Sequence, residues 1–152
     1  MSQISTAYDN FLARVAAVLT SGNGWKQVPN AYAIEKNPEP YLNQGYAVGF
    51  GAGTNTKRLQ SRTVSVAREF FVTICRVNDN LEDEVTGIQT AEKALLEDLK
   101  LLIADMETNQ TLNAGEILCS YVGDGGIESV DGETREILSI KANFLIEYFE
   151  TY

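Results

Sequence analysis

The side chains that most often carry out enzymatic chemistry are scarce in this chain. It contains no histidine, which removes Ser-His-Asp and Cys-His catalysis, histidine zinc sites and the commonest general base. Cys75 and Cys119 fall in strand-like segments without CxxC spacing, so we expect two buried, reduced thiols. A disulfide between neighbouring strands is the alternative. Neither cysteine has an activating base at a recognisable spacing, and a thiol without one is mostly protonated at neutral pH.

Three further segments resemble ligand-binding loops but miss the required spacing. In Gly49–Lys57, GFGAGTNTK, Thr54 stands where a dinucleotide-binding loop needs its third glycine, and no Gly-Lys-Ser/Thr follows. Asn78–Glu84 lacks the central glycine of a calcium loop, and Gly123–Glu133 has too few carboxylates in register. We therefore expect no cofactor and no metal, with a weak surface site for a divalent ion as the open alternative.

Two pairs of carboxylates could in principle do acid–base work, Glu97 with Asp98 and Glu133 with Glu136. The first pair lies next to the apolar stripe of an expected helix, so a solvated helix face is the better interpretation. The scarcity of catalytic residue types thus predicts a protein that is not an enzyme and that acts by binding other proteins.

Length and charge narrow the class further. A chain of 152 residues is the size of one domain, so we expect a single domain over residues 1–152. The formal net charge of −9 disfavours specific nucleic-acid binding, which depends on Lys and Arg contacts with phosphates. The N-terminus has no basic region followed by an apolar run, and no stretch has the composition of a membrane span. We expect a soluble protein that is cytosolic where it is made.

Hydrophobic periodicity predicts the elements of the first half of the chain. Apolar residues recur every three or four positions over Ile4–Leu19, which predicts an amphipathic helix. Trp25–Tyr41 holds all three prolines and is expected to be surface loop, with a short strand near Tyr32–Ile34. A hairpin follows, with arms at Tyr46–Phe50 and Arg62–Val77 and a turn-rich tip between them.

The second half is predicted to contain one long helix and two or three strands. The helix, Glu84–Met106, follows an acidic segment that suits a helix N-terminus. Its expected core stripe is Ile88, Ala91, Leu95, Leu99, Leu102 and Met106, widened by Leu96 and Ile103. Strands are expected at Glu116–Val122, near Ile127–Val130 and, most clearly, at Leu138–Phe149. The last strand has one wholly apolar face, and its other face becomes apolar at Leu145 and Phe149, where we expect a partner or a covering helix.

Together these elements predict an α+β fold: an antiparallel sheet with a long hairpin and two helices packed on one face. In order and length they resemble the tail-terminator, or tail-completion, family of long-tailed and contractile-tailed bacteriophages. The resemblance rests on the N-terminal helix, the hairpin arm SRTVSVAREFFVTICRV, the acidic entry to one long helix, and the closing strand SIKANFLIEYFE. The loop Trp25–Tyr41 and the turns near Gly123–Gly126 have no counterpart that we can align.

The resemblance implies a homohexameric ring in the tail-neck region of a virion, assembled in the host cytoplasm. Such a ring caps the tail tube, ends tail polymerisation and joins the tail to the head connector or stopper protein, and DNA passes through it. For contact with the tube protein we select the expected hairpin tip, Phe50, Thr54, Asn55, Lys57 and Arg58. For subunit or lumen contacts we select the acidic run Asp79, Glu82, Asp83 and Glu84.

Three alternatives remain open at this point. The nearest is another neck component, such as a head-completion or stopper protein. A monomeric adaptor that binds a peptide along a free sheet edge belongs to a different class. A small nucleotide or metal hydrolase is the third.

Overall fold

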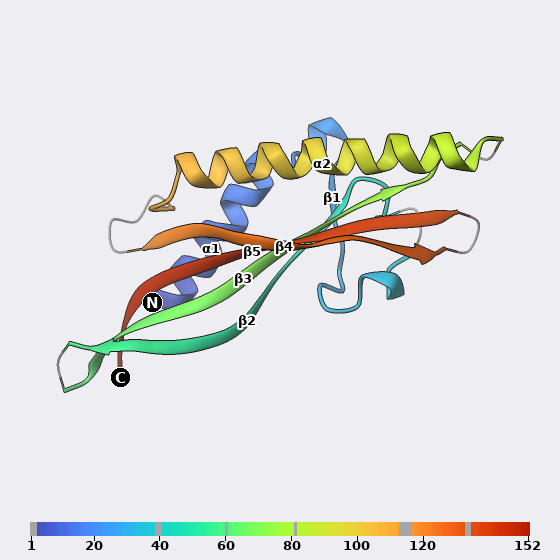
Figure 1. Ribbon diagram of the computed structural model, residues 1–152. Helices are drawn as coiled ribbons and strands as arrows, with labels where there is room; N and C mark the ends of the chain where they lie inside the picture. The colour runs from blue at the N-terminus through green and yellow to red at the C-terminus, as the bar shows by residue number, and fades with distance from the viewer. Residues whose placement is uncertain (1–2, 39–40, 60, 81, 113–116, 133–134) are drawn as a thin grey trace.

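A five-stranded sheet carries two long helices on one face (Figure 1). The computed structural model describes residues 3–38, 41–59, 61–80, 82–112, 117–132 and 135–152. Helix α1 spans Gln3–Val18 and helix α2 spans Glu84–Thr108. The strand order is β1-β2-β3-β5-β4, and every pairing is antiparallel except the short parallel contact of β1 with β2. The predicted α+β class and the placement of both helices are confirmed.

Strands β2, β4 and β5 are longer than the sequence patterns suggested, whereas β3 matches its predicted bounds to within one residue. Their bounds are Lys26–Gln27 for β1, Gly45–Arg58 for β2, Thr63–Val77 for β3, Leu118–Asp131 for β4 and Glu136–Thr151 for β5. The separate strands expected within β4 are one element, because register shifts near Gly123 and Gly126 absorb the glycines within continued pairing. Both glycines have positive φ, 142° and 78°, which glycine adopts readily. Glu116 lies outside the described residues.

The centre of the sheet is formed by β3 and β5, which pair along their whole lengths from Thr63 with Thr151 to Val77 with Ile137. The alternation predicted for β5 is confirmed, because its apolar face is buried throughout: Leu138, Ile140, Ala142, Phe144, Ile146 and Tyr148. The equivalent face of β3 is buried too, apart from the partly exposed Arg68 and Arg76. These two faces form the floor of the main core.

Aromatic side chains join α1 to this floor. Phe11 is fully buried, and its ring meets Phe70 edge-on at 5.3 Å between centroids and Phe144 at 5.5 Å. Tyr121 of β4 packs edge-on against Phe144 from the other side, at 5.6 Å. Such pairs add to the energy of apolar burial and fix the position of α1 on the sheet.

Helix α2 begins at Glu84, the residue predicted from the acidic segment that precedes it. Asp83 is its N-cap and accepts a hydrogen bond from the backbone N–H of Thr86 at 3.1 Å. The predicted stripe is confirmed by the burial of Ala91, Leu95, Leu99, Leu102 and Met106, with Ile88 and Ile103 partly buried. The expectation for Leu96 was wrong: it is 52% exposed, because it lies about 100° around the helix from Leu95.

Two bidentate ion pairs hold α2 in place. Arg14 of α1 binds Asp105 through Nε and Nη2, at 2.6 and 2.7 Å. Arg76 of β3 binds Asp98 in the same way, at 2.9 and 3.0 Å, and its guanidinium lies over the Trp25 ring. Asp98 is therefore not part of a solvated face as expected, because its partner comes from β3.

The segment between α1 and β2 also departs from expectation. No strand forms at Tyr32–Ile34; a short 3₁₀ helix occupies Ile34–Lys36, and β1 lies earlier in the chain. Much of this segment is not surface loop but covers one end of the second sheet face. There it forms a small core with these buried residues: Val28, Leu42, Ala47, Cys75, Val77 and Ile137.

Candidate functional site

The hairpin of β2 and β3 extends past the helices as an arm, with the end of β5 paired to β3 along it (Figure 1). Strand β2 is buried from Gly45 to Gly49, whereas every residue from Phe50 to Leu59 is exposed. The expected tip near Gly51–Thr56 was misplaced: these residues continue the strand, and the chain turns only after Arg58. Pairing continues to Arg58 opposite Val64, because the long β3 supplies partners despite the glycines.

The five residues expected to contact the tube therefore line the arm rather than cap it. Phe50, Asn55 and Arg58 are directly opposite β3 residues that enter the main core, so they lie on the helix-covered side. Thr54 and Lys57 lie opposite residues of the other side. Since cross-strand partners share a face, the arm presents two chemically different faces rather than one patch.

Phe50 forms the wall of a hollow that the sequence did not reveal. The Phe50 side chain is 45% exposed, although its ring meets Tyr8 edge-on at 6.0 Å and Phe70 at 6.2 Å. The hollow has a volume of about 490 Å³ and is lined by Ile4, Ser5, Tyr8, Asp9, Phe50 and Phe70. It joins the start of α1 to the root of the arm, two segments far apart in the chain.

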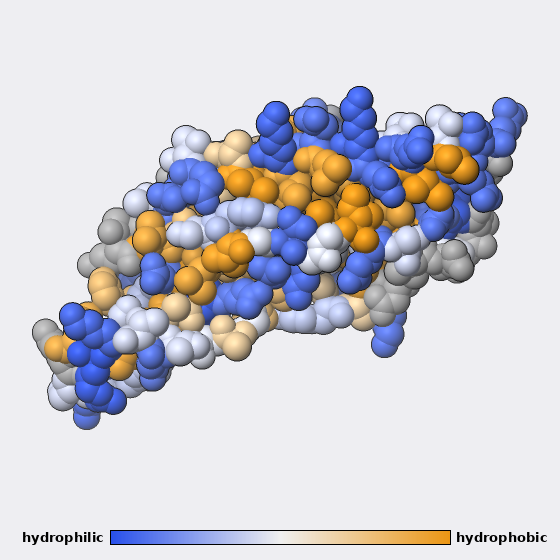
Figure 2. Space-filling model, viewed as in Figure 1, coloured by the Kyte–Doolittle hydropathy of each residue, from blue (hydrophilic) through white to orange (hydrophobic). Residues whose placement is uncertain are grey.

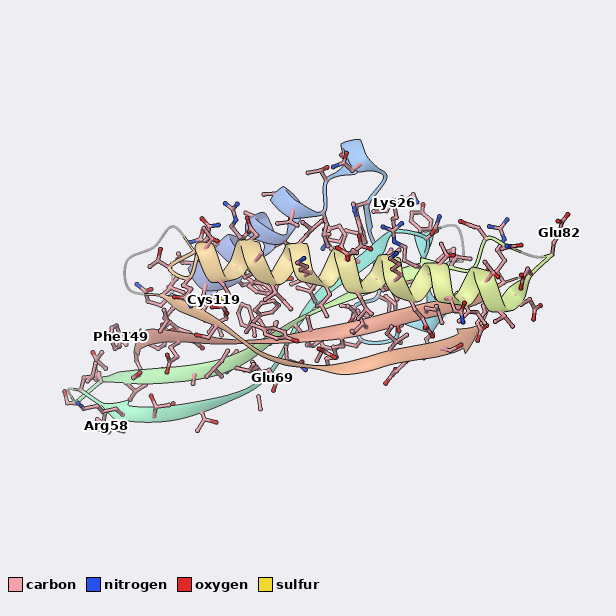
Figure 3. The ribbon with its side chains drawn as sticks, turned by 45° about the horizontal axis from the view of Figure 1, so that its top comes forward. Lys26, Arg58, Glu69, Glu82, Cys119 and Phe149 are labelled. Carbon is pink, nitrogen blue, oxygen red and sulfur yellow. The ribbon has the colours of Figure 1, made fainter. Side chains whose placement is uncertain are left out.

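The acidic run lies at the opposite end of the molecule, where Figure 3 labels Glu82. Two of its four carboxylates have structural roles. Asp79 accepts a hydrogen bond from Arg135 at 2.7 Å, and Asp83 caps α2. The hydroxyl and backbone N–H of Thr86, both donating to Asp83, lower the pKa of that carboxyl. Glu82 and Glu84 are exposed and are the members of the run available to a partner.

The sheet face away from the helices is only partly covered. Leu145 is half-buried and Phe149 is 39% exposed, and Leu118 of β4 lies on the same face, opposite Glu147, and is 42% exposed. The apolar end predicted for β5 is thus present. In Figure 2, seen from the side of Figure 1, apolar residues also gather on the flank of α2.

The surroundings of the two cysteines favour the protonated, unreactive form of each thiol. Both are free and buried, and burial raises the pKa of each thiol to about 12. The expected burial of both side chains is confirmed, and the two are not joined in a disulfide. Among the described residues no group of three or more His, Cys, Asp or Glu side chains could hold a metal ion. None of the helices in the described ranges is long and apolar enough to cross a membrane.

No protein-family model matches the chain, and no curated protein sequence is significantly similar to it. The surfaces described above, namely the exposed arm, the acidic end and the open sheet face, are therefore the observations from which its function is inferred.

Proposed function

We propose that this chain is a bacteriophage tail-terminator protein. Several copies would form a ring that caps the tail tube, ends tail polymerisation and provides the joint to the head connector. The protein would then reside in the tail-neck region of the virion after assembly in the host cytoplasm. The proposal takes the order of elements from the sequence resemblance and its contact surfaces from the geometry of the molecule.

The observation that carries the proposal is the exposed arm. Its outer strand, β2, is exposed from Phe50 to Leu59, whereas β3 beside it is paired on its other side with β5 as far as Thr63. Long exposed strand edges favour unwanted pairing, so proteins usually shorten or cover them. In a monomer this strand edge would stay exposed to solvent. In a ring, a neighbouring subunit or the end of the tail tube could cover it.

The charge of the chain fits a ring that DNA crosses. With a net charge of −9, an acidic lumen repels the phosphate backbone, so DNA would slide through without adhering. The tube contact is assigned to the arm around Phe50, Thr54 and Asn55, beside the hollow at α1. The exposed acids of the opposite end, Glu82 and Glu84, are assigned to subunit or lumen contacts.

The solution mass, measured by light scattering with and without tail tubes, tests this proposal. The tubes are assembled in vitro from purified tail-tube protein. We expect a hexamer, or a smaller species that becomes a ring on tube ends and stops further growth of the tube. A monomer that does not bind the tubes would contradict the proposal and favour one of the alternatives, another neck component, an adaptor or an enzyme.

Another neck component, such as a head-completion or stopper protein, is the second candidate. Both roles need the same exposed arm, so they are separated by the partner that is bound: a stopper binds purified connectors and leaves tube length unaffected. A monomeric adaptor is the third candidate, because among the described residues the outer edge of β2 beyond Tyr46 has no neighbouring strand and could accept a peptide strand, although the Tyr32 hydroxyl hydrogen-bonds the backbone of Phe50 there. Binding of a nucleotide or a metal ion, detected in a thermal-shift assay, would support the hypothesis that the chain is an enzyme.

A further inference from the structure

Exposed charges are segregated along the long axis of the molecule. The end of the arm carries Lys57, Arg58 and Arg62, and no acidic residue occurs in the sequence between Phe50 and Arg68. The opposite end carries the acidic run that precedes α2. Figure 3 places the labelled Arg58 and Glu82 at the two extremes. Glu150 of β5 also lies at this end, opposite Val64, but three exposed cations at one projecting end of an acidic chain would suit a partner surface of opposite charge.

The end of the arm also presents an apolar side chain in a defined geometry. Leu59 is 44% exposed at the turn, between Arg58 and Arg62. The turn is held by hydrogen bonds from Leu59 N–H to the Thr63 carbonyl and from Arg58 Nη1 to the Ser61 carbonyl, both 2.9 Å. An exposed apolar residue that follows Lys57 and Arg58, which lie on opposite faces of the arm, could act as an interface anchor with charged residues at its rim.

The acidic end contains a hollow that fits this anchor. It lies between the end of β3 and the first turns of α2 and has a volume of about 550 Å³. Val77, Ala91 and Ala94 supply its apolar lining, and Asp79 and Asn80 are among its polar residues. Glu82 and Glu84 follow directly in the chain. Arg76 also lines the hollow but is paired with Asp98, and Asp79 is paired with Arg135. Among the described residues, the unpaired acidic charge that could meet the arm's end therefore comes from Glu82 and Glu84 beside the hollow.

We propose that the end of the β2–β3 arm of one copy docks into this hollow on a second copy. Leu59 would enter the hollow, and Lys57, Arg58 and Arg62 would face the carboxylates around Glu82. This inference rests on the proposed ring and changes one assignment within it, because Lys57 and Arg58 contact a neighbouring subunit rather than the tube. The two surfaces differ and lie at opposite ends of the chain, so the contact is heterologous and repeats from copy to copy until a ring closes.

Charge exchange between the two surfaces tests the inference. The arm variant carries Lys57→Glu and Arg58→Glu, and the end variant carries Glu82→Lys and Glu84→Lys. Self-association of each is measured by sedimentation velocity at low ionic strength, over concentrations from low micromolar to several hundred micromolar. We expect each variant alone to associate at least about tenfold more weakly than the wild type. An equimolar mixture of the two, or one chain carrying all four changes, should recover association.

A matched control reverses two cations elsewhere, Lys93→Glu and Lys100→Glu, which are exposed on α2. It changes net charge as the arm variant does and should associate as the wild type does. Circular dichroism melting confirms that each variant is folded. Equal weakening by arm variant and control, or absence of recovery in the mixture, would overturn the inference, as would a wild type that stays monomeric throughout. Capping of tail tubes is assayed separately, so a ring built by another contact would leave the proposed function standing.

Discussion

Burial lowers the reactivity of the Cys75 and Cys119 thiols by raising their pKa. With a pKa of about 12 for each thiol, only about one molecule in ten thousand carries a thiolate at pH 8. We expect Ellman's reagent to modify neither cysteine in the native protein and both after unfolding in guanidinium. A comparison at increasing denaturant gives the control, because labelling should follow the unfolding transition. Fast modification of one thiol in the native protein would mean that its strand opens locally.

The N-cap Asp83 makes a small part of the stability depend on pH. Its carboxylate accepts hydrogen bonds from Thr86, so its folded pKa is below the ordinary value of 3.8. A depressed folded pKa stabilises the protein above pH 3.8 and loses that effect as the pH falls through the folded pKa. We expect the melting temperature of the wild type to exceed that of Asp83→Asn at neutral pH.

The difference between these two melting temperatures should shrink on acidification below the ordinary carboxyl pKa. Asparagine is the matched control, because its side-chain oxygen can cap the helix but does not titrate in this range. A difference that stayed constant from neutral to strongly acidic pH would show that the charge of Asp83 contributes nothing to the cap.

At the scale of elements, α2 provides a pair of adjacent leucines with opposite environments. Leu95 is fully buried beneath the helix, and Leu96 is 52% exposed on its flank. Leu95→Ala should lower the free energy of unfolding by about 3 kcal/mol, because it leaves a cavity in the main core. Leu96→Ala should change it by less than about 1 kcal/mol. Urea denaturation measures both, and similar losses in the two variants would contradict the assignment of the helix face.

The sequence predicted an element well where hydrophobic periodicity was its dominant pattern. The period-two pattern of β5 and the helical stripe of α2 predicted the element type, the ends to within two residues and, apart from Leu96, the buried face, because burial on one face dictates residue type at every step. Glycines misled the prediction in β2 and β4. They were interpreted as turns, but pairing with β3 and β5 continues past them, and that pairing is a tertiary contact that no local pattern encodes.

The candidate surfaces were less predictable than the fold. Exposed residues such as Glu82 and Arg58 could be selected by type, but their positions at opposite ends of the molecule follow from the strand order. The ion pair of Asp79 with Arg135, and the hollow at α1 and Phe50, join segments distant in the chain. Local sequence cannot predict such pairs, because they form only after the sheet is assembled.

For the whole molecule, segregation of charge predicts how association should respond to salt. The cations of the arm and the carboxylates near Glu82 are exposed, so added ions screen their attraction once the Debye length falls below the separation of the charges. Screening also reduces repulsion between copies of an acidic chain, and a contact driven mainly by apolar burial would therefore strengthen with salt. The two mechanisms therefore predict changes of opposite sign in the dissociation constant as salt is added.

We expect the dissociation constant for self-association to rise between about 0.05 and 0.5 M sodium chloride. The chain with all four charges exchanged should respond in the same way, because exchange preserves the attraction. A dissociation constant that falls with salt would place the main contact on the apolar surface of Leu118, Leu145 and Phe149 instead of the arm.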